Sequence, residues 1–290
     1  RRRRSFHGFG LDVECSRKRI NCIGANASGG AASLGANSIA LGGQSSVAAT
    51  AISGIAVGRG ATVNSIFGLA IGDGANASGS GSGIIAIGNG AKASVGTSTA
   101  IGVNANAANT DATALGNGAL ASGTQDTAIG VTARATGGSS SAFGNASNAS
   151  GGNSLALGVG NVASNFAAVA VGNQSKASGL RSVALGDQAN ASNTSAIALG
   201  TNANATQSGA IAMGQGAQGT GVNAVALGAG ALVRTDNSVA LGAGSTTAAT
   251  SPTNEYRQHF LDLGRAYPIA RRLDHVVATT DEIQEPFAVL

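Results

Sequence analysis

The side chains that most often carry catalysis or bind metals are scarce in this chain and lie near its ends. Among its 290 residues are three histidines and two cysteines, and none of them falls within residues 25–250. The two cysteines, Cys15 and Cys22, are separated by six residues. This spacing matches no zinc site, whereas a disulfide between them stays open. The long central region therefore lacks a histidine base and predicts no enzyme, metal or cofactor.

Charged side chains are also sparse in the central region. Residues 25–250 carry six Lys or Arg and five Asp, residues 1–24 carry seven Lys or Arg against two acids, and residues 251–290 carry four against six. A nucleic-acid-binding surface needs a basic stripe, which six scattered cations do not predict. Isolated surface cations are usually only solvated. Those that stay candidates for ligand contacts are Arg59, Lys92, Lys176 and Arg181.

A short phrase ending in glycine recurs along the central region, as in SAIALG at Ser195–Gly200 and SVALG at Ser182–Gly186. Fifteen copies follow one another in steps of 14 residues, except for two steps of 16 residues. A period this short and strict predicts a solenoid. The closing glycines are Gly42, Gly58, Gly72, Gly88, Gly102, Gly116, Gly130, Gly144, Gly158, Gly172, Gly186, Gly200, Gly214, Gly228 and Gly242.

Each copy has the pattern of two short strands. With the closing glycine as position 0, position −1 is large and apolar in all copies, position −3 is apolar in eleven, and position −2 is always alanine. This alternation predicts a strand with two different faces, and small residues at +3 and +5 predict a second strand. Gly, Asn, Ser and Asp between them suit tight corners. Stacked coils would then form parallel sheets in a rod of about 70 Å, with the two longer coils enlarging one corner to keep the register.

The faces of the first strand suggest what each packs against. We expect the large residues at −1 and −3, such as Ile197 and Leu199, to form the core, with Thr99, Thr113 and Thr127 bonded internally where they replace an aliphatic. We expect the invariant alanine, such as Ala198, to face the backbone of a neighbouring rod. Recent duplication is the alternative explanation for its invariance, although the corner positions have diverged freely.

The repeats resemble a known family. The units Asn237–Gly242, Ser182–Gly186 and Ser195–Gly200, each followed by an Ala-x-Ala-like segment, are similar to the head repeats of YadA-like trimeric autotransporter adhesins over about residues 25–250. The resemblance implies an all-β, left-handed parallel β-roll of about fifteen 14-residue coils that assembles as a homotrimer. It also implies export to the bacterial outer membrane and cell surface, where the outward corners and strand faces would attach to host extracellular-matrix proteins or host cells.

Both ends depart from this family pattern. Residues 1–24 form an atypical basic segment, and residues 251–290 show neither the heptads of a stalk nor the alternation of a membrane anchor. No signal peptide is visible, and we expect the chain to be a fragment. We hypothesise that both ends are foreign or frame-shifted sequence flanking a head region. Translation of the coding DNA in the other two frames tests this, because a complete absence of repeat, neck or stalk patterns would refute it.

Other solenoid classes fit less well. A β-helix acyltransferase is built on a six-residue repeat, and a calcium-binding solenoid needs a recurrent Asp. An ice-binding face needs threonine in most coils. The sequence therefore predicts an adhesin head that acts through many weak, multivalent contacts, without nucleic acid or a small-molecule substrate. The alternative is a passive spacer that holds another module away from the cell, and the residues that contact a ligand stay unknown.

Overall fold

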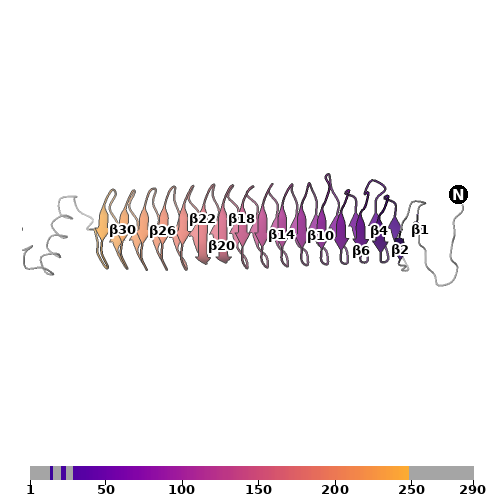
Figure 1. The fold of residues 1–290 in the computed structure, drawn as a ribbon. Coiled ribbons are helices and arrows are strands. Elements are labelled where there is room, and N and C mark those ends of the chain that lie inside the picture. Colours follow the sequence, from indigo (N-terminus) through magenta and orange to yellow (C-terminus); the bar gives the residue numbers. More distant parts are fainter. Residues whose placement is uncertain (1–13, 16–20, 24–28, 248–290) are drawn as a thin grey trace, which may run out of the picture.

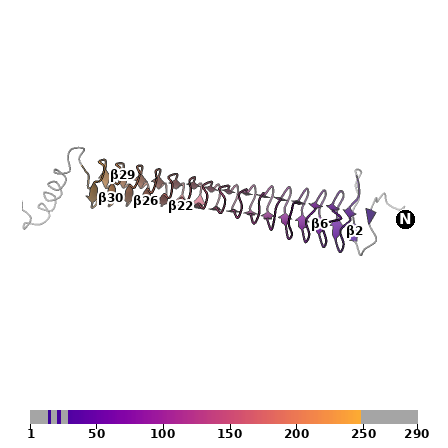
Figure 2. The same cartoon turned by 90° about the horizontal axis from the view of Figure 1, so that it is seen from above.

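The chain winds into a rod of stacked coils in the computed structural model, which describes residues 14–15, 21–23 and 29–247 (Figure 1). Every regular element in these residues is a β-strand of two to five residues. Each coil contributes one strand to each of two parallel sheets, which Figure 2 shows from above. The predicted all-β, parallel β-roll is confirmed.

Sheet A contains the sixteen odd-numbered strands. They are β1 (Glu14–Cys15), β3 (Ala32–Ser33), β5 (Ser46–Val47), β7 (Thr62–Val63), β9 (Asn76–Ala77), β11 (Lys92–Ala93), β13 (Asn106–Ala107), β15 (Leu120–Ala121), β17 (Arg134–Ala135), β19 (Asn148–Ala149), β21 (Val162–Ala163), β23 (Lys176–Ala177), β25 (Asn190–Ala191), β27 (Asn204–Ala205), β29 (Gln218–Gly219) and β31 (Leu232–Val233).

Sheet B contains the sixteen even-numbered strands. They are β2 (Asn21–Ile23), β4 (Ile39–Leu41), β6 (Ile55–Val57), β8 (Leu69–Ile71), β10 (Ile85–Ile87), β12 (Thr99–Ile101), β14 (Thr113–Leu115), β16 (Thr127–Ile129), β18 (Ser141–Phe143), β20 (Leu155–Val159), β22 (Val169–Asn173), β24 (Val183–Leu185), β26 (Ile197–Leu199), β28 (Ile211–Met213), β30 (Val225–Leu227) and β32 (Val239–Leu241).

The N-terminal strands β1 and β2 extend both sheets into the segment before residue 25. In their backbone register Cys15 pairs with Ser33 and Cys22 pairs with Ala40. The side chains of the two cysteines lie outside the described residues, and so does the whole segment 251–290.

The strands pair coil on coil without a shift. Ala114 of β14, for example, pairs with Ala128 of β16, and the corners continue the ladder, since Thr132 N donates to Asn117 O at 2.8 Å. In both 16-residue coils the extra residues enlarge the corner that leads from sheet A to sheet B. In the first of them β5 ends at Val47 and β6 begins only at Ile55, yet both strands keep their pairing. The prediction that the strands keep their register while one corner grows is confirmed.

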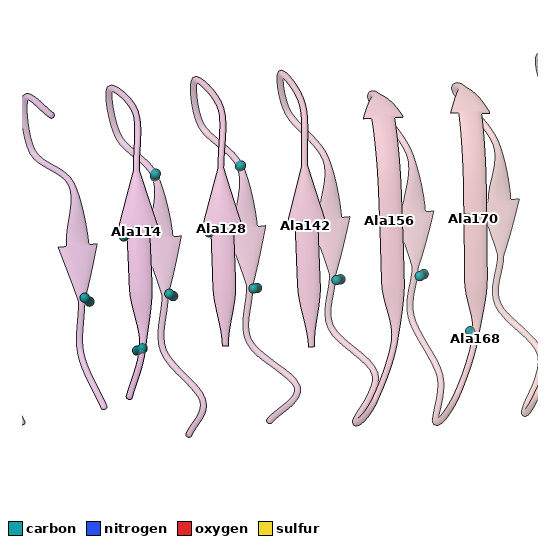
Figure 3. Close-up of a cluster of buried hydrophobic side chains, with 14 of the residues drawn as sticks. Ala114, Ala128, Ala142, Ala156, Ala168 and Ala170 are labelled. Carbon is teal, nitrogen blue, oxygen red and sulfur yellow. The ribbon is translucent and has the colours of Figure 1, made fainter. Parts of the chain in front are cut away.

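The interior of the rod is built from alanine, which corrects the predicted orientation of the first strand. The invariant alanine at −2 is buried between the two sheets in every coil, as are the small residues at −4, +3 and +5. Figure 3 shows these alanines stacked from coil to coil, among them Ala114, Ala128 and Ala142. The large residues at −1 and −3 point outward instead. The prediction that they form the core, and that alanine faces a neighbouring rod, is wrong.

The narrow space between the sheets explains this inversion. Where position +5 is valine rather than alanine, as at Val47 and Val63, the facing −4 position is Gly54 or Gly68. A Cβ on Gly54 would lie 2.9 Å from Val47 Cγ1, and a Cβ on Gly68 would lie 2.6 Å from Val63 Cγ1. One added methyl group on one side must therefore be removed on the other. A leucine or isoleucine from every strand has no room, and the alternating pattern can only place them outside.

Two polar side chains bridge adjacent coils inside the rod. Asp126 is fully buried; its Oδ2 accepts from Gly123 N at 2.6 Å, and its Oδ1 accepts from Ser140 N at 2.9 Å and Ser140 Oγ at 2.8 Å. Asn161 is equally buried, donates to the carbonyl of Gly172 at 2.7 Å and accepts from Ser175 N at 2.8 Å. Because their hydrogen bonds are made within the rod, these groups stabilise the stacking of neighbouring coils.

The closing glycine of each coil has a conformation and a setting that no other residue fits. Gly186 has a φ of +138°, and a Cβ on it would lie 2.5 Å from Gly200 O in the next coil. We expect Gly186→Ala to lower the free energy of unfolding by about 3 kcal/mol or more, since backbone strain and a clash with backbone act together. Thermal unfolding followed by circular dichroism measures this.

Gly216→Asn is the matched control for this substitution. Gly216 also has a positive φ, +67°, but open space surrounds its Cβ direction, and Asn202 holds the same place one coil earlier with φ +56°. We expect this variant to unfold at nearly the temperature of the unmodified chain. Equal effects of the two substitutions would contradict the role given to the closing glycine.

Candidate functional site: the outer surfaces of the rod

The outer face of sheet B carries two rows of large side chains along the rod. One row is position −1 and the other is position −3, and together they cover β4 to β32. Exposed members include Leu157 at 43%, Leu185 at 46% and Met213 at 44%. Soluble monomers rarely expose a continuous apolar surface of this extent, so the sheet B face has the character of an interface.

A band of hydroxyl side chains interrupts the −3 row. Thr99, Thr113, Thr127 and Ser141 occupy four successive coils and point outward, each half-buried. The prediction that these hydroxyls replace core aliphatics is wrong, because the row faces away from the interior. The band places a polar segment within an otherwise aliphatic row, opposite no interior partner.

The outer face of sheet A is polar, unlike that of sheet B. Its side chains come from positions +4 and +6, the second of which is mostly Ser or Thr. Exposed cations stand at +4 in Lys92, Arg134 and Lys176, and at +6 in Arg234. Neither row contains a carboxylate in the described coils. The two sheets thus give the rod one apolar and one polar, weakly basic side.

The corners carry the residues that vary most between coils. Arg59 and Asp73 lie in the same corner of adjacent coils, where Arg59 Nε donates to Asp73 Oδ1 at 3.1 Å and Arg59 Nη2 lies 2.5 Å from Asp73 Oδ2. The hydrogen bond from Arg59 lowers the pKa of Asp73 below its ordinary value, and the same bond raises the pKa of Arg59. Both side chains are exposed, so the pair contributes little to stability.

The enlarged corners near the N-terminal end expose a small apolar cluster. Ile52 and Ile66 occupy equivalent places in adjacent coils, and Phe67 is 62% exposed with a φ of +53°. Phe67 N donates to Ile52 O at 2.9 Å, which fixes the two corners together. A bulky residue in this backbone conformation is uncommon.

The four cations singled out in the sequence do not converge on one site. Arg59 lies in a corner paired with Asp73, and Arg181 lies in the opposite corner of a coil more than eight coils away. Lys92 and Lys176 share the outer face of sheet A but are six coils apart. Sequence reasoning passed over Arg134, which stands midway between them on the same face. Its signal was available, since 42 residues separate it from each.

The described residues offer no arrangement typical of a metal centre. Within residues 14–15, 21–23 and 29–247, no group of three or more His, Cys, Asp or Glu comes together. The same part of the chain contains no helix long and apolar enough to cross a membrane.

Comparison with known proteins matches the repeats to one family. The model described as the YadA head domain repeat fits residues 96–119, 121–147, 135–161, 149–165, 163–189, 191–217 and 220–245. A search of curated proteins found no match. The overlapping matches follow the 14-residue coil, so one repeat unit of the model corresponds to stacked coils of the rod.

Proposed function

Because the chain belongs to the family of YadA head domain repeats, we propose that it is the head of a trimeric surface adhesin that binds host extracellular-matrix proteins or host cells. The observation that carries the proposal is the division of the rod surface. One face along the whole rod is aliphatic, and the other face and the corners are polar and variable. A rod that buries the first in self-association keeps the second available for a partner.

The proposed assembly is a homotrimer in which the sheet B faces of three chains meet. Rows of Leu, Ile and Val on each chain would bury one another, with the closing glycines and alanines keeping each coil thin. The hydroxyl band from Thr99 to Ser141 would then hold the three chains in one register, because a shift along the axis would place hydroxyls against aliphatics. Anchoring at the bacterial outer membrane would come from sequence other than these repeats.

Adhesion in this proposal is multivalent and involves no catalysis. Each coil presents a similar corner about 4.8 Å from the next, and three chains present it three times. Weak contacts repeated along a rigid rod add up to an avidity far above that of a single contact. The residues that change from coil to coil, at +1, +7 and +8, are the ones we assign to partner contacts.

The test compares the purified full chain with a corner-scrambled variant for binding to collagen, fibronectin, laminin and cultured host cells. The variant exchanges residues at +1, +7 and +8 between coils and keeps every glycine and every residue with positive φ. We expect the unmodified chain to bind at least one of these partners and the variant to bind at least about tenfold less, since several contacts are lost together. Circular dichroism must show the same fold in both.

The second candidate function, a passive spacer, predicts a different result. A rod that only holds another module away from the cell needs its stiffness but not its corner residues. Negligible binding by both proteins would therefore favour the spacer and refute the adhesin. Strong, equal binding by both would place the contacts away from the corners.

A further inference from the structure

The outer face of sheet A has a second period that is three coils long. Along position +4 a cation, an asparagine and an aliphatic residue follow one another in successive strands and then begin again. The third group ends in Asn204 instead of an aliphatic, and Gln218 takes the next cation position. The groups are Lys92, Asn106 and Leu120; Arg134, Asn148 and Val162; and Lys176, Asn190 and Asn204.

The exposure of these residues follows the same period. Lys92, Arg134 and Lys176 are exposed, whereas the asparagines and aliphatics between them are half-buried in the face. Successive cations are separated by 42 residues, or three coils, which corresponds to about 14 Å along the rod. The result is a straight row of charges at regular intervals over a flat sheet.

The surroundings of this row favour an anionic partner. The adjacent +6 positions supply mostly Ser and Thr hydroxyls. In the described coils the acidic residues lie elsewhere: Asp73, Asp111, Asp187 and Asp236 are in corners and Asp126 is inside the rod. Uncompensated cations on a polar face attract a polyanion, and a linear row fits one that is extended.

We propose that the outer face of sheet A binds a sulfated polysaccharide chain that lies along the rod. Each three-coil group offers what one segment of such a chain requires. The Lys or Arg pairs with a sulfate or carboxylate, the Asn amide and the neighbouring hydroxyls bond sugar hydroxyls, and the Leu or Val packs against the apolar face of a sugar ring. The inference rests on the proposed surface display and names one class of partner for it.

A single-stranded nucleic acid fits this face less well. Proteins that hold single strands stack the bases on aromatic side chains, and positions +4 and +6 carry no aromatic residue in the described coils. The density of charge is also low, with one cation in three coils, whereas nucleic-acid affinity comes mainly from closely spaced phosphate contacts. Hydroxyl and amide groups dominate the face, as a sugar partner demands.

The test measures binding of the full chain to immobilised heparin by surface plasmon resonance at about 0.15 M salt. All proteins carry glutamine at Arg1–Arg4, Arg17, Lys18 and Arg19, because the basic N-terminal segment would itself bind heparin. The test variant adds Lys92→Gln, Arg134→Gln and Lys176→Gln. Glutamine suits this position, since Gln218 occupies it three coils further on. We expect the test variant to bind heparin at least about tenfold more weakly, as three exposed ion pairs are lost.

A control variant removes the same number of charges away from the face. It carries Arg59→Gln, Arg181→Gln and Arg257→Gln, and we expect its affinity to stay within about twofold of the parent. Equal loss in the control, or no loss in the test variant, would overturn the proposal. So would single-stranded DNA that binds as tightly as heparin and depends on the same three cations, or desulfated heparin that binds as tightly as heparin.

Adhesion assays on the same proteins separate this proposal from the proposed function. If the parent attaches to matrix or cells but binds no heparin, the polysaccharide proposal fails and the adhesin stands. If heparin binding depends on the three cations while the parent attaches to none of the tested matrix proteins or cells, the adhesin fails and the polysaccharide site stands.

Discussion

Replacing Ala128 by leucine is expected to unfold the coil that holds it and to lower the melting temperature of the whole rod. Ala128 lies in β16 at position −2, fully buried between the two sheets. The space there admits one methyl group more only when a facing Cβ is missing, as at Val47 and Gly54. Overpacking this interior should cost about 3 kcal/mol or more, at the upper end of its usual range. Circular dichroism melting of the purified chain measures the loss.

Thr127→Leu is the matched control, since it adds a similar bulk one residue earlier in the same strand. Thr127 points outward, and Leu69 and Leu155 already occupy its position in other coils. We expect this variant to melt at or above the temperature of the unmodified chain. An Ala128→Leu chain that melts like the control would mean that the interior of the rod has been assigned to the wrong face.

Charges on the outer face of sheet B are expected to break the assembly without unfolding the coils. Leu157 and Leu185 are 43% and 46% exposed in the single chain, so Leu157→Asp with Leu185→Asp leaves its interior unchanged. In the trimer each aspartate would be buried without a partner at a cost of about 3 kcal/mol or more. Analytical ultracentrifugation should find single chains, while circular dichroism should still show β structure.

The control places the same number of aspartates on the outer face of sheet A. Asn148→Asp with Asn190→Asp adds two charges per chain at positions that the proposed trimer leaves in solvent. We expect this variant to assemble like the unmodified chain. If both variants stay assembled, the chains meet somewhere other than the sheet B face.

The sequence predicted the architecture of the rod because a period of 14 residues allows few solutions. The closing glycines, the alternation before them and the small residues after them define two strands and two corners in each coil. Identical coils can then stack only with like positions in register, as Ala114 and Ala128 do. The larger corner before Ile55 followed from the same argument, since two extra residues inside a strand would turn its faces over.

The direction of the faces could not be predicted from the alternation alone. An alternating strand has two faces, and the usual assumption places its larger apolar side chains inside. Here the distance between the sheets decides instead, and it belongs to the coil as a whole and not to any one strand. A signal did exist in the sequence: Val47 and Val63 are each followed by Gly54 and Gly68 at the facing position, which is the compensation expected between residues that touch.

The candidate surfaces were predictable in part for a related reason. Composition indicated a rod without catalytic groups, and the corner positions stood out by their variation. The row of Lys92, Arg134 and Lys176 becomes a surface only once the coil length is known to divide 42 residues into three equal steps. Asp126 shows the opposite limit, because an acidic residue in a corner-like sequence is found inside the rod with all its hydrogen bonds made to Gly123 and Ser140.

The most direct test of this account is the mass of the full chain in solution, measured by sedimentation equilibrium over a range of concentrations. The aliphatic rows outside sheet B are explained only if other copies of the chain cover them. The account predicts a stable species of three times the 27.7 kDa chain mass. A well-folded species that stays at the mass of one chain at every concentration would contradict it.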